Sequence, residues 1–333
     1  MADHFFWQDK KVLITGGSGF IGSHLTQTLI NFGCHVTIID KIPPTNLPLK
    51  GKENGFIRFE EVDLAHFSWK PLLLNEQYNA LFHLAGNANV SLSVQKPNMD
   101  YETNLGYTFK MLEAMREIGW GGVLIYPSSA AVYGNPITLP ISEMDSTIPI
   151  SPYGVSKLAA ERYIAVYSHL YGLRTASLRP FSIYGPNQRK QVVYDLIQKI
   201  LASPNAIEIY GDGSQTRDFL FVSDLIEASL LVVEKGKLQG ETYNVASGQE
   251  RSILNVVETI CGLLDIHPRY SFTGAVRPGE PERWAVNIER LQQLGFTSTV
   301  RFEDGILEVI KWCIDGGKNM KRKRKINYHL RLV

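Results

Sequence analysis

The stretch KVLITGGSGFIGSHL, residues 11–25, joins a short apolar run to a helical pattern through a turn rich in glycine. The β-branched residues of KVLIT favour a strand, and residues 20–33 have the apolar spacing of a helix. The glycines fit two spacings, Gly17-x-Gly19-x-x-Gly22 and a three-residue repeat through Gly16, Gly19 and Gly22. The stretch therefore predicts a strand, a tight turn and a helix, in that order.

A turn of this kind lets the backbone approach a pyrophosphate, and the positive end of the following helix attracts the negative charge. Asp40 ends the next apolar run, HVTIID, where a carboxylate can accept hydrogen bonds from both ribose hydroxyls of an adenosine. Because the carboxylate would repel a 2′-phosphate, NAD is favoured over NADP, although Lys41 beside it leaves NADP open. The alternative is a turn that binds nothing.

The chain continues with alternating strand and helix patterns as far as residue 181. Further strands are expected at 56–64, 80–86, 122–129 and 175–181, and helices at 104–119 and 153–172. Strands alternating with helices imply a parallel sheet covered on both faces. The fold class is therefore α/β, a Rossmann-type doubly wound parallel sheet with a smaller α/β C-terminal substrate lobe.

The second half of the chain has shorter elements separated by loops rich in glycine and proline. Helices are expected at 192–202, 223–234, 252–264 and 303–315. We predict a dinucleotide-binding domain over 1–180, a substrate lobe over 181–315 that is partly interleaved with it, and a basic tail over 316–333. The tail contains KRKRK, which is either solvated or a contact for an anionic membrane or partner.

Composition excludes several classes of function. The 333 residues are 44% hydrophobic and 20% charged, with a net charge of +1, so no overall field favours nucleic acid. Three widely spaced cysteines suit a reducing compartment and form no metal cluster, so we expect no metal. The sequence begins without a signal-peptide pattern and has no apolar run of membrane-spanning length. We expect a cytoplasmic protein without an integral membrane segment.

Two groups of polar residues lie at or after the end of the strand at 122–129. Ser128 and Ser129 lie where that strand ends, and ligands of such sheets bind outside the carboxyl ends of strands. Tyr153 and Lys157 begin the next long helix, one turn apart on one face. A nearby ammonium and a positive nicotinamide would lower the pKa of the phenol and favour the phenolate. The alternative is a chance pair on a helix surface.

These motifs together resemble those of the extended short-chain dehydrogenases/reductases, specifically the nucleotide-sugar epimerases and dehydratases. The motifs occur in the family's order and span roughly residues 10–295. They are TGGSGFIG, Asp40, Asp63-Leu64, HLAG (83–86), Asn104, SSAAVYG, YGVSK, LRPFSIYGP (178–186) and GDGSQTRDFLFVSDL (211–225).

The resemblance implies a role for each matching residue. Tyr153 would be the catalytic acid/base, Ser129 its hydroxyl partner, and Lys157 would hold the nicotinamide ribose. For Asn104 the alternative is a cap of the following helix. The residues implied in NAD binding are Gly16, Gly19, Phe20, Ile21, Gly22, Asp40, Lys41, Asp63, Leu64, Leu84, Ala85, Gly86, Asn104, Ser128, Tyr153, Lys157 and Pro180.

The residues after Ser129 distinguish between members of the family. Sugar 4,6-dehydratases of this kind carry an Asp-Glu pair there, and decarboxylases keep a glutamate, whereas this chain has Ala130 and Ala131. The cysteine used by the epimerase-reductase that makes GDP-fucose has no counterpart in a matching motif. The stretch LSVQKP (92–97) resembles ESVQKP of UDP-galactose 4-epimerases.

The resemblance therefore favours an NAD-dependent nucleotide-sugar 4-epimerase. In such an enzyme C4 is oxidised to a 4-keto sugar, the sugar turns over, and the same hydride returns to its other face. Two alternatives stay open. One is another enzyme with 4-keto chemistry, namely an atypical dehydratase, a 3,5-epimerase or a decarboxylase. The other is a catalytically silent nucleotide-sugar-binding protein.

The implied substrate is a nucleotide diphosphate sugar, with a UDP-sugar favoured. Its implied ligands are Ser129, Tyr153, Ser182, Arg217, Arg277 and Glu280. Ser182 replaces an asparagine of the usual LRYFN motif. For Arg217 the alternative is an ion pair with Asp218 or Asp224. Trp284 would restrict sugar size or belong to the core.

Three further expectations concern the lobe and the quaternary structure. Tyr210 could stack on the nucleotide base, but core packing is favoured, and the NQRKQ cluster (187–191) either lines the phosphate path or is a solvated loop. A homodimer would pair the helices that begin near 104 and 153. The apolar stripe on 158–171 allows this pairing, although the same stripe suits a core.

Overall fold

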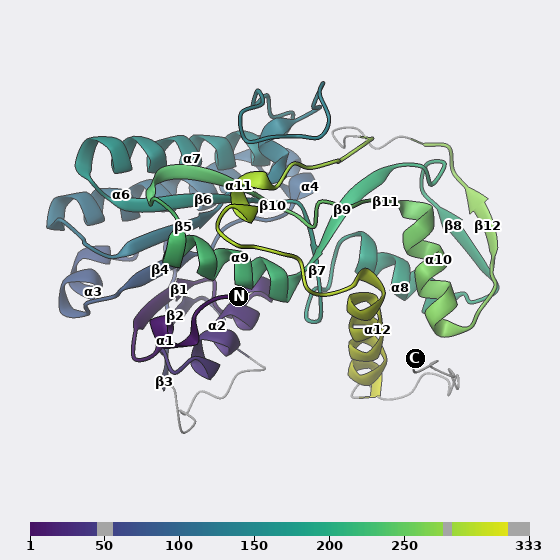
Figure 1. The fold of residues 1–333 in the computed structure, drawn as a ribbon, viewed down its shortest axis with the longest axis horizontal. Coiled ribbons are helices and arrows are strands. Elements are labelled where there is room, and N and C mark those ends of the chain that lie inside the picture. Colours follow the sequence, from purple (N-terminus) through teal and green to yellow (C-terminus); the bar gives the residue numbers. More distant parts are fainter. Residues whose placement is uncertain (45–55, 276–281, 319–333) are drawn as a thin grey trace.

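Seven parallel strands form the central sheet of the computed structural model, which describes residues 1–44, 56–275 and 282–318 (Figure 1). The strand order is β10-β6-β5-β4-β1-β2-β3. The strands are β1 (Lys11–Thr15), β2 (His35–Asp40), β3 (Phe56–Glu61), β4 (Ala80–His83), β5 (Val123–Pro127), β6 (Arg174–Pro180) and β10 (Gln239–Val245). The predicted Rossmann-type α/β fold is confirmed.

Helices cover both faces of this sheet, because each strand turns alternate apolar residues to opposite sides. In β1, Val12 and Ile14 belong to the core on one face and Leu13 to the core on the other. One face carries α2 (Phe20–Asn31) and α9 (Val222–Lys235), and the other carries α3 (Trp69–Asn75), α6 (Tyr107–Ile118) and α7 (Pro152–Tyr171) (Figure 1).

The strand order reverses between β1 and β4, and ligands of open α/β sheets bind at such a switch point. The two turns that follow these strands are held together there. Leu84 N donates to Thr15 O at 3.0 Å, and Ala85 N donates to Thr15 Oγ1 at 3.2 Å. The glycine turn and the HLAG motif, which are far apart in the sequence, therefore share one edge of the sheet.

Beyond β6 the chain builds a smaller lobe with its own core. Its strands are β7 (Ser182–Tyr184), β9 (Thr216–Phe221) and β11 (Glu250–Ser252) in one sheet, with β8 (Ala206–Ile209) and β12 (Arg269–Phe272) paired beside it. Its helices are α8 (Val192–Ala202), α10 (Ile253–Leu264) and α12 (Phe302–Lys318), whereas α11 (Glu289–Gln292) packs beside β10 against the core of the large sheet. From within this part of the chain, β10 and α9 return to the large sheet.

Helix boundaries differ from the sequence-based expectation at two places. The helix expected from residue 104 begins earlier, as α5 (Pro97–Tyr101), and continues through a π-helix, Glu102–Gly106, into α6. Proline at the first helical position explains this start, because its missing N–H costs nothing there. Helix α12 continues to Lys318, past the expected start of the basic tail at 316, and KRKRK lies outside the described residues.

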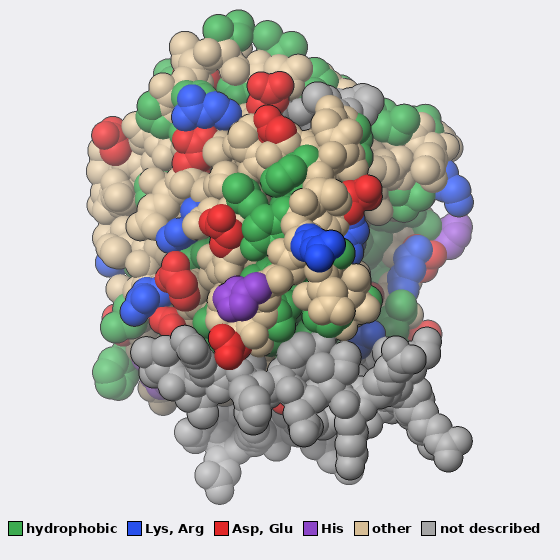
Figure 2. All heavy atoms as spheres, turned by 90° about the vertical axis from the view of Figure 1, so that its right-hand side faces the viewer, with side chains coloured by type: hydrophobic (Ala, Val, Ile, Leu, Met, Phe, Trp, Pro, Cys, Tyr) green, Lys and Arg blue, Asp and Glu red, His purple; other side chains and the backbone are tan. Residues whose placement is uncertain are grey.

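Shorter elements complete the chain, namely α1 (His4–Trp7), α4 (Val90–Gln95) and a 3₁₀-helix, Ala130–Tyr133. On the face shown in Figure 2, basic and acidic side chains are interspersed, and no extended area carries a single sign. Within the described part of the chain, none of the helices combines the length and apolar character needed to span a bilayer.

Candidate active site

Two glycines of the turn after β1 stand where the neighbouring backbone leaves no room for a side chain. Gly16 has a φ of +71°, and a Cβ there would lie 2.7 Å from Ala85 N. A Cβ at Gly22 would lie 2.3 Å from Gly16 O. Gly19 differs, because it is exposed and its Cβ would meet only Gly16 O, at 3.2 Å. The absent side chain of Gly19 therefore leaves room for a ligand against the backbone.

The start of α2 is suited to hold an anion beside a diol. The cap residue Gly19 offers no side chain to the N–H groups of the first turn, so these donors can serve a ligand. Asp40 Oδ2 accepts a hydrogen bond from Ser18 N at 3.0 Å, which places the carboxylate next to the turn. This geometry matches the predicted roles of the glycine turn and Asp40 in holding a dinucleotide.

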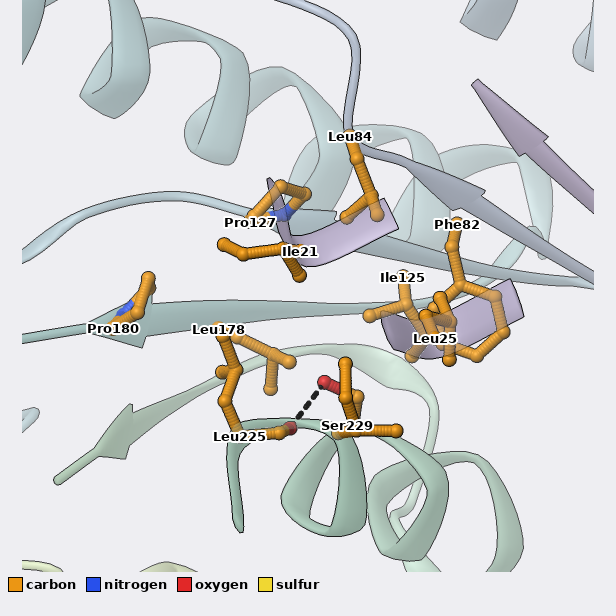
Figure 3. A pocket seen from close by; sticks show the side chains of 11 residues that line it. Ile21, Leu25, Phe82, Leu84, Ile125, Pro127, Leu178, Pro180, Leu225 and Ser229 are labelled. Atoms are coloured by element: carbon orange, nitrogen blue, oxygen red, sulfur yellow. Dashed lines mark hydrogen bonds between the residues drawn. The ribbon is translucent and has the colours of Figure 1, made fainter. Parts of the chain in front are cut away.

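Three of the predicted cofactor residues converge on one apolar cavity of about 20 Å³ between the sheet, α2 and α9. Figure 3 shows Ile21 and Leu84 near Pro127 at one end, with Pro180 beside them. The cavity holds at most about one water molecule, so it is a gap in the packing rather than a binding site. The residues that line it show that Ile21, Leu84 and Pro180 form one apolar wall.

The predicted adenine end of the site lies after β2 and β3. Lys41 Nζ and Asp63 Oδ2 form an exposed ion pair at 3.0 Å, and Asp63 Oδ1 accepts from Ala65 N at 3.0 Å. The hydrogen bond from Ala65, followed by that from Lys41, holds the pKa of Asp63 below its ordinary value. Leu64 is buried beside them. Asp63 and Lys41 therefore constrain each other at the rim of the predicted site.

Ser129 and Tyr153 are brought together where β5 ends and α7 begins. Their side chains share a hydrogen bond, and Ser129 Oγ also accepts from Ala131 N at 3.1 Å. Gly154 allows this approach, because a Cβ there would lie 2.6 Å from Ala131 O. The contact between the first turn of α7 and the loop after β5 thus depends on the glycine inside the YGVSK motif.

The protonation state of Tyr153 depends on its burial. Burial raises the pKa of this phenol above its ordinary value, and the hydrogen bond with Ser129 opposes the rise. In the chain without cofactor desolvation outweighs every favourable contact, and the lowering of this pKa by Lys157 together with the positive nicotinamide stays a prediction. Tyr153 is therefore a protonated acid at neutral pH in this state.

Lys157 lies in a dry environment at the end of β5. Its Nζ donates to Pro127 O at 2.8 Å and lies 4.7 Å from the centre of the Tyr126 ring. Burial lowers the pKa of Lys157 to about 8, and the charge of Asp100 opposes this fall. The ammonium is thus held by a carbonyl and a ring face, and its proton is exchangeable near neutral pH.

Several buried polar atoms at this edge of the sheet have no partner among the described residues. They include Ser18 Oγ, Asn104 Oδ1 and Ser128 Oγ. Because buried polar groups are normally hydrogen-bonded, such atoms suit a ligand with its own donors and acceptors. The glycine turn, the helix start, the apolar wall and these atoms together fit a dinucleotide.

Asn104 also corrects an alternative. It lies inside the π-helix rather than at a helix start, so it caps nothing. Its Nδ2 donates to Asp100 Oδ1 at 3.1 Å and to Ser156 Oγ at 3.2 Å, and its Oδ1 points at the backbone of Gly86, where a Cβ would lie 2.5 Å away. Asn104 thus connects α7 to the HLAG turn.

The predicted substrate ligands in the lobe are only partly described. Ser182 begins β7 and Arg217 lies in β9 of the same sheet, where Arg217 Nη1 donates to Thr216 O at 2.8 Å. The alternative for Arg217, an ion pair with Asp218 or Asp224, stays a prediction. Arg277 and Glu280 lie outside the described residues.

Asp218 and Asp224 both accept hydrogen bonds from loops of the lobe. Asp218 accepts from Ser247 N at 2.7 Å and Gly248 N at 2.8 Å. Asp224 accepts from the backbone and hydroxyl of Thr299, at 3.1 and 2.8 Å. Both carboxylates therefore hold loops of the lobe.

Aromatic residues near the predicted sugar site form a cluster. Trp284 meets Phe181 edge to face at 5.0 Å between ring centres, and Phe181 is stacked on Tyr133 at 6.2 Å. Trp284 is partly buried beside this cluster. Tyr210, for which core packing is the favoured expectation, is 38% exposed, so that expectation is wrong. Within NQRKQ, Arg189 lies 5.7 Å from the Trp312 ring centre.

Sequence reasoning misses three residues that shape this site, namely Asp100, Gly154 and Ser156. Gly154 and Ser156 stand inside YGVSK, so the motif itself was a signal. Asp100 stands four residues before Asn104, one helical turn away, but a single aspartate in a polar stretch gives no comparable signal.

Comparisons with known proteins agree with this geometry. The model of the NAD-dependent epimerase/dehydratase family matches residues 12–246, and the chain belongs to that family. The family depends on NAD, which is the cofactor of this protein. Its members include epimerases and dehydratases. The protein is thus an enzyme of nucleotide-sugar chemistry.

The similar proteins include epimerases and dehydratases. The chain is 33% identical to the dTDP-glucose 4,6-dehydratase of Salmonella typhimurium, covering 91% of this chain and 92% of that protein. It is 31% identical, with a TM-score of 0.82, to the structure of UDP-N-acetylglucosamine 4-epimerase from Methanobrevibacter ruminantium. The match covers 93% of this chain and 99% of that one. The UDP-glucose 4-epimerase of Thermus thermophilus, solved with NAD, shares 29% identity and a TM-score of 0.79 over 91% and 98%.

Proposed function

We propose that the protein is an NAD-dependent nucleotide-sugar 4-epimerase. The observation that carries this proposal is the pair Ala130 and Ala131 beside an otherwise complete Ser129, Tyr153 and Lys157. Removal of water needs an acid and a base next to the sugar, and alanine supplies neither. Inversion at C4 needs only a group that takes and returns one proton.

Each of the three residues has one task in this mechanism. Tyr153, in the phenolate form that the positive nicotinamide would favour, takes the proton of the C4 hydroxyl and returns it when the hydroxyl is restored on the other face. Ser129 holds the same oxygen through its hydroxyl and keeps Tyr153 in place by their mutual hydrogen bond. Lys157, fixed on Pro127 O, would hold the nicotinamide ribose. Bound NAD supplies a reversible hydride acceptor.

The residues proposed to hold NAD lie along the edge of the sheet at the switch point. The N–H groups after Gly19 would bind the pyrophosphate, and Asp40 the adenosine ribose. Ser128 and Asn104 each present an unpartnered buried oxygen there, and the apolar wall of Ile21 adjoins them. The proposed sugar-nucleotide ligands are Ser182, Arg217, Arg277 and Glu280.

The substrate is proposed to be a UDP-sugar. Arginine suits a diphosphate, because its planar guanidinium donates two parallel hydrogen bonds. The edge-to-face pair of Trp284 and Phe181 supports a small sugar, since a bulky ring there would exclude an N-acetyl group. A panel of UDP-glucose, UDP-glucuronic acid and UDP-N-acetylglucosamine tests this preference.

Product analysis tests the reaction itself. Purified protein is incubated with each UDP-sugar and with dTDP-glucose, and the products are separated and weighed by mass spectrometry. A stereoisomer of unchanged mass supports epimerisation at C4. Loss of 18 Da would show dehydration, and the proposed reaction would then be wrong.

Tyr153→Phe is the matched variant, because it removes one oxygen and leaves the buried ring. We expect kcat to fall by about 10³-fold, since a positioned acid/base contributes roughly 10²–10⁴-fold. NAD binding, measured by calorimetry, should change little. A Phe variant with normal turnover would remove Tyr153 from the mechanism.

We also propose a homodimer formed through α6 and α7, and a cytoplasmic location in keeping with three free thiols. The stripe expected on 158–171 divides into two parts. Ile164 is fully buried in the core, whereas Tyr163 is 43%, Val166 48% and Leu170 62% exposed. The ring centre of Phe109 in α6 lies 5.2 Å from that of Tyr163 on the same surface. Light scattering at micromolar protein should give the mass of two chains.

A further inference from the structure

Asp100 is a fully buried carboxylate in α5 that the proposed mechanism does not use. Its Oδ1 accepts hydrogen bonds from Asn87 Nδ2 at 2.6 Å and Asn104 Nδ2 at 3.1 Å. Its Oδ2 accepts from Ser156 Oγ at 2.6 Å. Among the described residues no cation forms an ion pair with it. A buried carboxylate that accepts hydrogen bonds from neutral donors only destabilises the fold unless a nearby positive charge compensates it.

The network joins Asp100 to the first turns of α7. Ser156 stands between Tyr153 and Lys157 in the sequence, and its Oγ lies 3.0 Å from Tyr153 O. Ser156 Oγ also accepts from Asn104 Nδ2, so Asp100, Ser156 and Asn104 form a closed triangle. On the other side Ser93 Oγ of α4 accepts from Tyr153 N at 3.1 Å. The helix start is thus fixed from α4, α5 and the π-helix.

Titratable groups from several elements surround Lys157. Burial, followed by the charge of Lys157, lowers the pKa of His83 in β4 to about 3, so its ring is neutral. Burial raises the pKa of Tyr126 in β5 well above its ordinary value, so this ring is neutral as well. Neither group can balance an ammonium near neutral pH.

The remaining groups lie on α7 and α5. Tyr153 is a neutral phenol in this state, because burial raises its pKa. The carboxylate of Glu161 is bound by Arg179 at 2.5 Å. Asp100 is therefore the acidic group near Lys157 whose charge no arginine or lysine neutralises among the described residues.

We propose that Asp100 is a positioning residue for the Tyr153–Lys157 pair. Its buried carboxylate fixes the first turn of α7 through Ser156 and supplies the negative charge that balances Lys157. The inference rests on the proposed function only for its kinetic arm, because the balance of charge belongs to the protein whatever reaction follows.

The sign of the effect follows from charge. A negative group favours the protonated form of each neighbour, so Asp100 raises the pKa of both Lys157 and Tyr153. Asp100→Asn removes the charge and nearly keeps the shape. Both groups should then lose their protons at lower pH than in the wild type.

The kinetic test is the pH profile of kcat/KM. In the Asp100→Asn holoenzyme, where bound NAD favours the phenolate, the ascending limb, set by Tyr153, and the descending limb, set by Lys157, should move together toward acid by about one pH unit. A role limited to holding the helix would lower the curve without moving it. A profile in its wild-type position overturns the proposal.

The second test does not depend on turnover. In protein labelled with ¹³C at lysine Cε, the Lys157 signal is the one that Lys157→Arg removes, and its midpoint of titration is followed by NMR. The midpoint should lie at lower pH in Asp100→Asn than in the wild type, even if the enzyme catalyses another reaction. An unchanged midpoint refutes the charge balance, whereas a wrong product refutes only the proposed function.

Glu161→Gln is the matched control, because it removes another buried carboxylate from α7. It should lower the melting temperature and leave both the pH profile and the Lys157 midpoint in place. An equal shift in this variant would show a general effect of charge and overturn the assignment to Asp100.

Ser156→Ala keeps the test decisive if Asp100→Asn fails to fold. This variant retains the carboxylate and removes its link to α7, so kcat should fall about tenfold while the pH profile stays in place. Full activity in Ser156→Ala overturns the positioning role.

Discussion

Helix α7 carries two buried charge arrangements, one turn apart, that are built in different ways. Arg179 Nε and Nη2 donate to the two carboxylate oxygens of Glu161, at 2.9 and 2.5 Å, and both side chains are almost fully buried. Four residues earlier, Lys157 contacts a carbonyl oxygen and a ring face instead. The first arrangement is a closed ion pair, whereas the second leaves the cation without a carboxylate in contact.

The pKa values of the two cations diverge accordingly. Burial alone would lower the pKa of Arg179, but the hydrogen bonds and charge of Glu161 raise it above its ordinary value. For Lys157 burial prevails and lowers the pKa to about 8, with Asp100 in opposition. The closed pair therefore favours the charged form of Arg179, whereas the open arrangement leaves Lys157 with a proton that can be exchanged near neutrality.

The largest expected effect comes from breaking the closed pair. Glu161→Gln leaves the Arg179 guanidinium buried without its counter-charge, which costs about 3–5 kcal/mol of unfolding free energy. Urea unfolding measures the loss. The double variant Glu161→Leu with Arg179→Met should recover most of it, because apolar residues can replace a whole buried pair. A Glu161→Gln variant whose unfolding free energy in urea lies within about 1 kcal/mol of the wild-type value would contradict this comparison.

An intermediate effect is expected at the open arrangement. Lys157→Met should reduce kcat by about 10²-fold and weaken NAD binding, while the unfolding free energy stays the same or rises. The reason is that the variant removes an ammonium that the fold desolvates. Parallel urea and kinetic measurements separate the two results. A large loss of unfolding free energy with normal turnover would show that Lys157 has a structural role, as Arg179 does, and would contradict its role in the reaction.

The smallest effect is a pH dependence of stability. The pKa of Lys157 is lower in the folded chain than in the unfolded chain, so above pH 8 the unfolded state binds more protons and stability rises with pH. Between about pH 8 and 9 the wild type should gain about 1 kcal/mol relative to Lys157→Met. Urea titrations at both pH values measure the difference, and equal slopes for the two proteins would contradict the lowered pKa.

Much of the fold is predictable from the sequence because its signals are local. The glycine turn, the apolar strands and the helical spacing of 20–33 each depend on neighbouring residues. The helix expected at 192–202 has those bounds in the structure, and the strand at 35–40 does as well. Tyr153 and Ser129 were predictable as partners because the motifs that carry them have a fixed order.

The rest depends on contacts between distant segments. Burial of Tyr153 and the charge of Asp100 decide the protonation of the site, and no spacing in the sequence reports either. The exposure of Tyr210 depends on where β8 ends. The start of the helix before Asn104 was missed because Pro97 marks it, seven residues earlier than the apolar pattern.

Strand β10 has a consequence for how the protein is made. It lies beside β6 in the large sheet, yet it is translated only after β7, α8, β8, β9 and α9. A ribosome that has released only the first 180 residues therefore presents β6 as an uncovered edge, a template for unwanted pairing. The large sheet is complete only after Val245 has been synthesised, so its last strand becomes available after much of the smaller lobe.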